Sequence, residues 1–230
     1  MTAHGVSLVT LDIAGTSVDE GGAVYVALRD TVEEHLGEPI PDDRFDRWKG
    51  TGKRQAIAGL LGQVMVGEID AVESDFTGRL VDAYRSVPPV PMPGIVNAFA
   101  VLRDHDVKIV LQTGYSRAIA GPLLEQVDWR VGRDIDAVIT SDQVRASRPA
   151  PYLIFHAMET VGVQSVSQVL VAGDTPNDLR AGVNAGVRYV AGVLTGAHDA
   201  ASLRREPHTH ILTSAATIPE VLGLQESVTL

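Results

Sequence analysis

The sequence contains no cysteine among its 230 residues. This absence excludes disulfide bonds, a thiolate nucleophile and metal sites built on cysteine sulfur. Basic residues are also scarce, because 19 lysines and arginines stand against 29 acidic residues and give a formal net charge of −10. A phosphate backbone is bound through a basic surface. We therefore expect no nucleic-acid partner.

Long hydrophobic runs are absent as well. No segment is long enough to span a bilayer, and the N-terminus lacks the basic and apolar regions of a signal peptide. A basic amphipathic helix for a membrane surface is also missing. We expect no membrane association and a cytoplasmic protein. Hydrophobic residues nevertheless make up 45% of the chain, which is enough for a core in one domain with a sizeable insertion or in two small domains.

Short apolar segments rich in valine and isoleucine alternate with helical patterns. The segments are continuously apolar rather than alternating, which is typical of parallel strands buried on both faces. The predicted strands are 6–11, 108–112, 137–140, 168–172 and 188–194. The predicted helices between them are 94–105, 116–126, 151–161 and 176–185. This alternation predicts an α/β fold with a doubly wound, Rossmann-like parallel sheet.

The segment 20–91 shows no strand pattern. Its helical patterns cover 23–36, 42–48, 52–61 and 69–87, and the last has one apolar face. The segment ends in the proline-rich stretch PPVPMPG, which is a stiff connection. We therefore predict a helical cap, residues 20–91, inserted into an α/β core formed by residues 1–19 and 92–230. If the protein forms a homodimer, we expect the contact to involve this cap.

Polar residues follow each predicted strand at the point where it ends. They are Asp12 and Asp19 after the first strand, Thr113 and Gly114 after the second, Arg148 after the third, and Asp174 and Asp178 after the fourth. Ligands of doubly wound sheets bind at these carboxyl ends. Clustered carboxylates bind a hard cation, for which we expect Mg²⁺, while a hydroxyl, helix N–H groups and an arginine suit an anion. The pattern indicates a site that handles phosphoryl groups.

These residues, in this order, resemble the four motifs of the haloacid dehalogenase superfamily, and the resemblance extends from residue 8 to about 190. Three details resemble its phosphonoacetaldehyde hydrolase branch. DIAGTSVD has Ala14 where the phosphatases carry a second aspartate, SRPAP carries Arg148 where most members have lysine, and TGYSR places Tyr115 after Thr-Gly. That branch cleaves a carbon–phosphorus bond.

The resemblance implies a role for each matched position. Asp12 is the nucleophile that becomes an aspartyl phosphate, and Thr113 and Arg148 hold the phosphoryl oxygens. Gly114 and Tyr115 lie against the substrate. Mg²⁺ is held by Asp12, by the backbone carbonyl of Ala14 and by Asp174, and Asp178 orients the metal shell or Arg148.

The branch also carries a cap lysine that forms a Schiff base with the substrate aldehyde. The matching stretch here is KGTGKRQAI, which offers Lys53. Lys49 is a rival for this role and a candidate for substrate binding; if both lie on one helix, Lys49 is one turn away and lowers the pKa of Lys53. Ala56 stands where the branch has a histidine associated with proton transfer near the imine. This departure indicates a modified substrate or proton relay.

Ala14 and Lys53 are chemically linked. An alkoxide leaving group needs a proton, which the second aspartate of a phosphatase supplies. A carbon leaving group needs an electron sink instead, which a protonated imine provides. The leading hypothesis is a Mg²⁺-dependent hydrolase of phosphonoacetaldehyde or a related 2-oxoalkylphosphonate. The alternatives are a phosphatase for a small phosphate monoester and a catalytically silent binding protein on the same fold.

Overall fold

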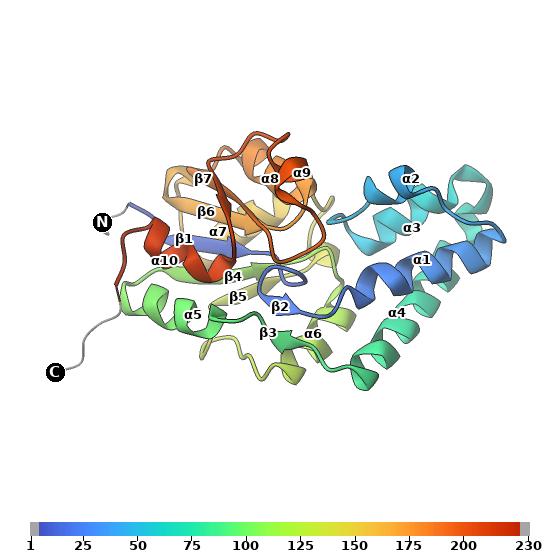
Figure 1. Cartoon of the computed structure of the whole chain (residues 1–230), viewed down its shortest axis with the longest axis horizontal. Helices are drawn as coiled ribbons and strands as arrows, with labels where there is room; N and C mark the ends of the chain where they lie inside the picture. The colour runs from blue at the N-terminus through green and yellow to red at the C-terminus, as the bar shows by residue number, and fades with distance from the viewer. Residues whose placement is uncertain (1–4, 226–230) are drawn as a thin grey trace.

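A computed structural model describes residues 5–225 of the chain. Its centre is a six-stranded parallel sheet with the strand order β5-β4-β1-β6-β7-β8 (Figure 1). The strands are β1 (Leu8–Leu11), β4 (Lys108–Gln112), β5 (Ala137–Ile139), β6 (Val169–Gly173), β7 (Tyr189–Val193) and β8 (His210–Leu212). The predicted doubly wound α/β core is therefore confirmed.

Strand β1 lies in the middle of the sheet, between β4 and β6. Its last residue, Leu11, pairs with Leu111 on one side and with Ala172 on the other. Because all three strands run in parallel, their carboxyl ends meet at one edge. The register therefore brings the loops that follow β1, β4 and β6 together.

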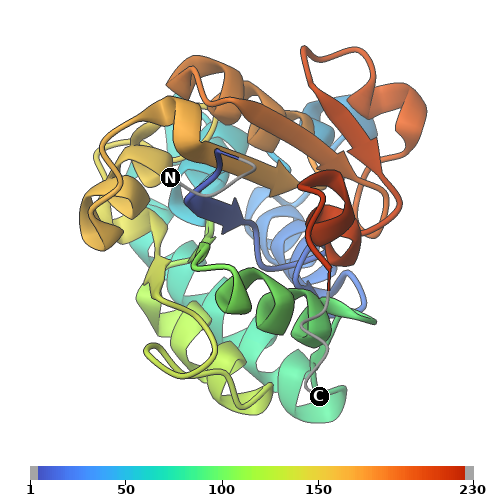
Figure 2. The ribbon, with the colours of Figure 1, turned by 90° about the vertical axis from the view of Figure 1, so that its left-hand side faces the viewer.

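Helices cover both faces of this sheet (Figure 2). They are α5 (Ile95–Asp104), α6 (Arg117–Gln126), α7 (Tyr152–Val161), α8 (Pro176–Ala185), α9 (Ala200–Leu203) and α10 (Ile218–Val221). Successive side chains of a strand point to opposite faces. Accordingly, Leu8 packs in a core cluster with Ile154 of α7, while Val9 belongs to a second cluster with Phe99 of α5. Burial on both faces explains why the strand sequences are continuously apolar.

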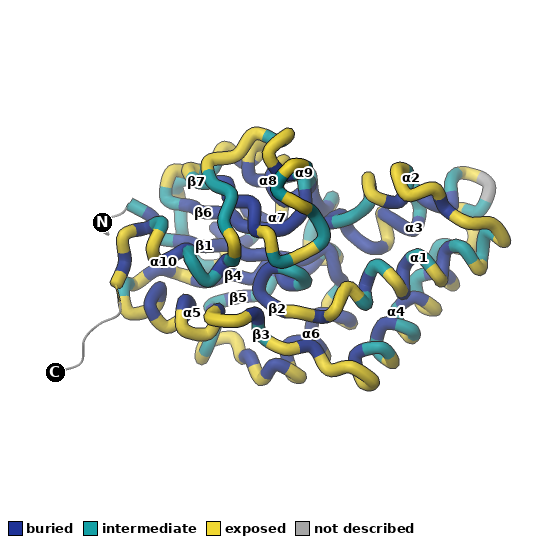
Figure 3. The backbone as a smooth tube through the Cα atoms, viewed as in Figure 1, coloured by how far each residue is buried: buried dark blue, intermediate teal, exposed yellow. Residues whose placement is uncertain are grey.

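Four helices form a separate group beyond the carboxyl ends of the strands (Figure 1). They are α1 (Ala23–Leu36), α2 (Asp42–Asp46), α3 (Lys53–Leu61) and α4 (Ile69–Ser86), with a 3₁₀ segment at Gln63–Glu68. Helix α1 packs against α3 and α4. The apolar face of α4 is buried through Val72, Phe76, Leu80 and Tyr84, and Figure 3 shows buried and exposed positions alternating along these helices.

A two-residue antiparallel ribbon joins the sheet to this helical group. Val18–Asp19 (β2) pairs with Val90–Pro91 (β3). The expectation that residues 20–91 contain no strand is wrong at Val90–Pro91. This pair forms a strand only through its long-range partner, and two residues that end in proline carry no strand pattern of their own. We propose that this ribbon divides the core from the cap at residues 19 and 92; the outermost residues of the predicted core lie outside the described range.

The sequence does not predict strand β8, because its three residues are only half-buried at the sheet edge and form no continuous apolar run. The predicted elements otherwise match the observed ends to within two residues. Within residues 5–225, no helix has both the length and the apolar character needed to cross a membrane.

Candidate active site

Asp12 follows β1 and is buried at the centre of the strand ends. Its Oδ1 lies 2.8 Å from Nη1 of Arg148, and the same nitrogen also pairs with Oδ1 of Asp178. The guanidinium group is only 2% exposed. Burying a cation costs several kcal/mol unless it is paired. The two carboxylates supply that pairing and fix the guanidinium beside Asp12.

Asp178 is held by its own helix terminus. Its Oδ2 accepts hydrogen bonds from the backbone N–H of Thr175, at 3.1 Å, and from the Thr175 hydroxyl. The Thr175 side chain in turn accepts from the N–H of Asp178, which completes a capping box at the start of α8. Both carboxylate oxygens of Asp178 are therefore engaged, and the contact with Arg148 makes Asp178 a positioning residue for that cation.

Asp174 follows β6 and is also buried. Its oxygens accept hydrogen bonds from the Thr16 hydroxyl, at 3.2 Å, and from the backbone N–H of Ala197, at 2.7 Å. Burial and the negative charge of Asp12 raise the pKa of Asp174 to about 6. Asp12, Asp174 and Asp178 each offer an oxygen within 4.8 Å of the others. This buried oxygen set fits a hard divalent cation, which would relieve the repulsion between Asp12 and Asp174.

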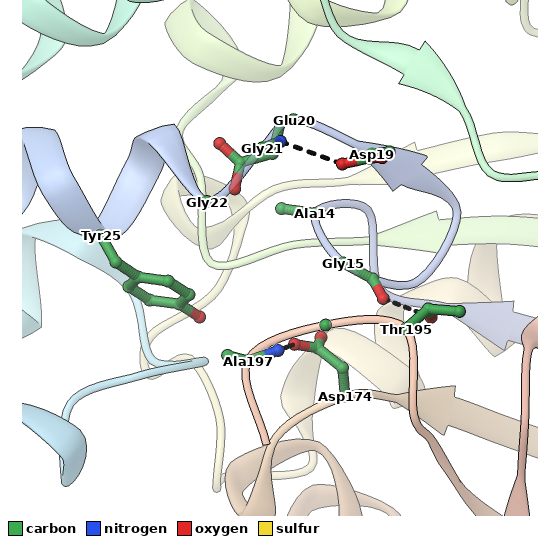
Figure 4. A pocket seen from close by; sticks show the side chains of 11 residues that line it. Ala14, Gly15, Asp19, Glu20, Gly21, Gly22, Tyr25, Asp174, Thr195 and Ala197 are labelled. Carbon is green, nitrogen blue, oxygen red and sulfur yellow. Dashed lines mark hydrogen bonds between the residues drawn. The ribbon is translucent and has the colours of Figure 1, made fainter. Parts of the chain in front are cut away.

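A tight loop after β1 places Ala14 close to the buried carboxylate of Asp174. Gly15 has φ = +77°, and a Cβ there would lie 2.9 Å from Oδ2 of Asp174, so the turn requires glycine. Ala14 then lines a cavity of about 220 Å³. The other lining residues include Asp19, Glu20, Gly21, Gly22, Tyr25, Asp174, Thr195 and Ala197 (Figure 4). The cavity is smaller than typical drug-sized pockets and suits a small molecule.

The loop after β4 connects the core with the helical group. Thr113 is buried, and its Oγ1 accepts a hydrogen bond from the N–H of Tyr115 at 3.1 Å. The carbonyl of Gly114 accepts from the N–H of Lys53 at 3.0 Å. On the other side, the Asn177 side chain donates to the carbonyl of Lys49 at 2.7 Å. The segment that carries both lysines is therefore docked on the strand ends.

Gly114→Ala is expected to prevent this docking. A Cβ at position 114 would lie 2.2 Å from the Thr51 carbonyl oxygen, which is backbone and cannot yield without moving the segment. We expect faster amide hydrogen exchange at the start of α3. For the phosphonoacetaldehyde substrate expected from the sequence, kcat/KM should fall at least tenfold. Gly121→Ala is the matched control, because a Cβ there meets nothing within 4 Å. Unchanged exchange in Gly114→Ala would show that docking does not depend on this close approach.

Lys53 begins α3, and its side chain is buried. Its Nζ lies 5.4 Å from the ring centroids of both Tyr25 and Tyr115 and donates one long hydrogen bond, 3.4 Å, to the Thr51 carbonyl. Burial and then the positive charge of Arg148 lower the pKa of Lys53 to about 8. A weakly bonded buried ammonium costs stability, which makes Lys53 a candidate functional residue.

Lys49 has different surroundings. Its Nζ pairs with Asp46 at 2.8 Å and lies 5.5 Å from the Tyr25 ring centroid. The condition that Lys49 and Lys53 lie on one helix is not met, because α3 begins only at Lys53 and the intervening stretch contains two glycines. The cation that lowers the pKa of Lys53 is Arg148.

Glu20, Tyr84 and Tyr115 form a buried hydrogen-bonded cluster. The sequence does not predict this cluster. The Oε2 of Glu20 accepts from the N–H of Val24, at 2.9 Å, and from the Tyr84 hydroxyl, at 3.3 Å. The Tyr84 and Tyr115 hydroxyls are 3.1 Å apart. Burial raises the pKa of Glu20 to about 7. Tyr84 lies on the buried apolar face of α4, and no local pattern reveals that its hydroxyl reaches Glu20.

The sequence profile of the haloacid dehalogenase-like hydrolases matches residues 6–186, which is most of the chain. The chain belongs to this family. The predicted resemblance is thus confirmed. Phosphonoacetaldehyde hydrolase from Parabacteroides distasonis is 31% identical over 212 residues, which cover 84% of this chain and 78% of the relative. A phosphonoacetaldehyde hydrolase-like protein from Syntrophobacter fumaroxidans is 27% identical over 202 residues, covering 82% and 72%.

Solved structures show the same haloacid dehalogenase-like fold. A phosphonoacetaldehyde hydrolase-like protein from Oleispira antarctica superposes with a TM-score of 0.81 at 18% identity, covering 97% of this chain and 93% of the other. A hydrolase from Pseudomonas syringae gives the same TM-score and identity, covering 94% and 98%. This hydrolase is therefore related to the phosphonoacetaldehyde hydrolases in sequence, and its motif residues meet at the strand ends where the fold places ligands.

Proposed function

We propose that this hydrolase cleaves the carbon–phosphorus bond of phosphonoacetaldehyde or a related 2-oxoalkylphosphonate. The observation that carries the proposal is the buried Lys53 ammonium, whose lowered pKa responds to the charges of Arg148 and Asp12. A lysine must be neutral to attack an aldehyde. A pKa near 8 leaves roughly a tenth of the lysine neutral at pH 7, against about 1 in 2,500 for an ordinary lysine.

The phosphoryl half of the reaction is assigned to the strand-end residues. The Asp12 carboxylate attacks phosphorus and becomes an aspartyl phosphate, which water then hydrolyses. Arg148, fixed by Asp178, and the Thr113–Gly114 loop bind the phosphoryl oxygens. Asp12, Asp174 and the carbonyl of Ala14 would hold Mg²⁺, which supplies charge neutralisation for the approach of an anionic substrate to a carboxylate. Arg148 and the metal ion would thus place positive charge at the site of an anionic substrate, in a chain whose net charge is −10.

The lysine half makes the carbon a leaving group. Neutral Lys53 adds to the aldehyde, and loss of water gives a protonated imine. When the carbon–phosphorus bond breaks, its electron pair moves toward the imine nitrogen and leaves an enamine. Protonation of the enamine carbon and addition of water release acetaldehyde and regenerate Lys53. No oxygen departs from phosphorus in the bond-breaking step, which agrees with a methyl group at Ala14 where phosphatases have an acid.

A product assay tests the proposal. With Mg²⁺ and phosphonoacetaldehyde, we expect equal amounts of phosphate and acetaldehyde, and kcat/KM at least 100-fold above that for glycolaldehyde phosphate, a phosphate monoester of similar size. Faster release from the ester would assign the chain to the phosphatases. Binding of both compounds without turnover of either would indicate a silent binding protein. A substituted 2-oxoalkylphosphonate that exceeds the parent compound would show that the substrate carries a further group, for which Lys49 is the candidate contact.

A further inference from the structure

Imine chemistry at Lys53 requires a group that gives and takes protons. Position 56, one turn along α3, cannot supply one, because Ala56 is fully buried and carries only a methyl group. Lys53 itself donates to a backbone carbonyl and lies against two aromatic rings. The proton must therefore come from another element of the cap or the core.

Glu20 lies where such a group is needed. It follows the β2 strand and lines the same cavity as Ala14, Tyr25 and Asp174, and Figure 4 shows it on the side opposite Asp174. Its hydrogen bonds lead toward the lysine: the Tyr84 hydroxyl donates to its Oε2 and lies 3.1 Å from the Tyr115 hydroxyl, and the Tyr115 ring centroid lies 5.4 Å from Nζ of Lys53. Its carboxyl group is buried, although glutamate is almost never fully buried unless it is paired.

The electrostatic surroundings hold the pKa of Glu20 near neutrality, so that both of its protonation states are populated at pH 7. Burial raises its pKa to about 7, whereas the N–H of Val24, the Tyr84 hydroxyl and the positive charge of Lys53 act in the opposite direction. Asp174, which faces it across the cavity, adds to the rise. A general acid or base works best with a pKa near the working pH.

We propose that Glu20 is the proton-transfer residue of the lysine half of the site. The inference rests on the proposed function. Protonated Glu20 gives its proton to the hydroxyl of the carbinolamine on Lys53; the carbon–oxygen bond breaks, water leaves, and the nitrogen lone pair forms the iminium. The Glu20 carboxylate then faces a positive iminium. In the closing hydrolysis it takes a proton from the water that adds to the imine carbon, which restores the acid.

Glu20→Gln tests the proposal, because glutamine keeps the size of the side chain and cannot transfer the proton. With phosphonoacetaldehyde and borohydride, we expect the wild type to be trapped at Lys53 and the variant to be trapped at least 100-fold more slowly. Beryllofluoride binding at Asp12 with Mg²⁺ should be unchanged. Glu38→Gln, an exposed position in the same cap, is the matched control and should be trapped at the wild-type rate.

The pH profile gives a second readout. Protonated Glu20 and neutral Lys53 together predict a bell-shaped kcat/KM that rises to about pH 7 and falls above about pH 8. Glu20→Gln should lose the fall at high pH, because only the neutral lysine is then required. Tyr84→Phe should raise the pH at which the rise levels off, because the lost hydrogen bond had stabilised the carboxylate. If Glu20→Gln does not fold, the pH profile of Tyr84→Phe tests the role of Glu20 instead, and an unshifted profile would contradict it.

The outcomes separate the two proposals. If the wild type turns over phosphonoacetaldehyde but is never trapped, the imine mechanism fails and the role of Glu20 fails with it. If the wild type is trapped and Glu20→Gln is trapped equally fast with the same pH profile, only the role of Glu20 is wrong. Weaker beryllofluoride binding in Glu20→Gln would place Glu20 in the phosphoryl half and also overturn the inference.

Discussion

Asp12→Asn is expected to lower turnover by on the order of 10⁵–10⁶-fold, the scale of losing a covalent nucleophile in other hydrolases. The amide cannot form the aspartyl phosphate, and the variant should show no burst of phosphoenzyme in rapid-quench experiments. The effect should be confined to chemistry, because Asp178 still pairs with the buried Arg148 when the charge of Asp12 is removed. Near-wild-type folding by circular dichroism is therefore part of the expectation.

Asp30→Asn is the control for this substitution, because Asp30 is exposed on α1 and should leave kcat within twofold of wild type. A loss of less than tenfold in Asp12→Asn would show that another group attacks phosphorus. Equal losses in both variants would show that the purified protein is sensitive to any change of charge, and the assignment of Asp12 would then lose its support.

Lys53→Met is expected to lower kcat/KM for phosphonoacetaldehyde by at least 10³-fold, or about 4 kcal/mol of transition-state stabilisation. The same variant should be more stable than the wild type, because it removes a buried ammonium. A lysine pKa lowered from 10.5 to about 8 corresponds to about 3 kcal/mol at pH 7. Opposite changes in activity and stability exclude misfolding as the cause of the loss.

The stability difference should depend on pH in a defined direction. Between pH 8 and 10.5 the unfolded chain holds a proton on Lys53 that the folded chain has released, so wild-type stability rises with pH in this window. The advantage of Lys53→Met should therefore be largest below pH 8 and vanish above about pH 10.5. Urea unfolding at pH 7 and pH 10.5 measures it.

Lys49→Met is the matched control. Lys49 pairs with Asp46, and its side chain is 21% exposed, so the substitution should change stability by less than about 1 kcal/mol. We expect imine formation to survive. If Lys49→Met abolished the reaction and Lys53→Met did not, the roles of the two lysines would be exchanged.

The sequence could predict the parts of the site that depend on the sheet alone. Asp12, Thr113 and Asp174 each follow a continuously apolar segment, and parallel pairing around β1 brings such positions together whatever the loops do. The cap helices were also predictable, because the buried residues of α4 repeat with helical spacing. In these segments the apolar pattern of the sequence coincides with the positions that the fold buries.

The remaining features depend on contacts between distant residues. Glu20, Tyr84 and Tyr115 come from three different elements, and each alone is an ordinary polar or aromatic residue. The β2–β3 ribbon and strand β8 are too short to carry a periodic signal. The separation of Lys49 from Lys53 depends on where α3 begins, and a glycine-containing turn makes that point uncertain from sequence.

The central claim is that Lys53 forms an imine with the substrate aldehyde. The most direct measurement is borohydride reduction during turnover of phosphonoacetaldehyde, followed by peptide mass spectrometry of the Lys49–Arg54 region. The account predicts one adduct, with the mass of the reduced two-carbon fragment, on Lys53. An adduct confined to Lys49, or full turnover with no adduct on either lysine, would contradict it.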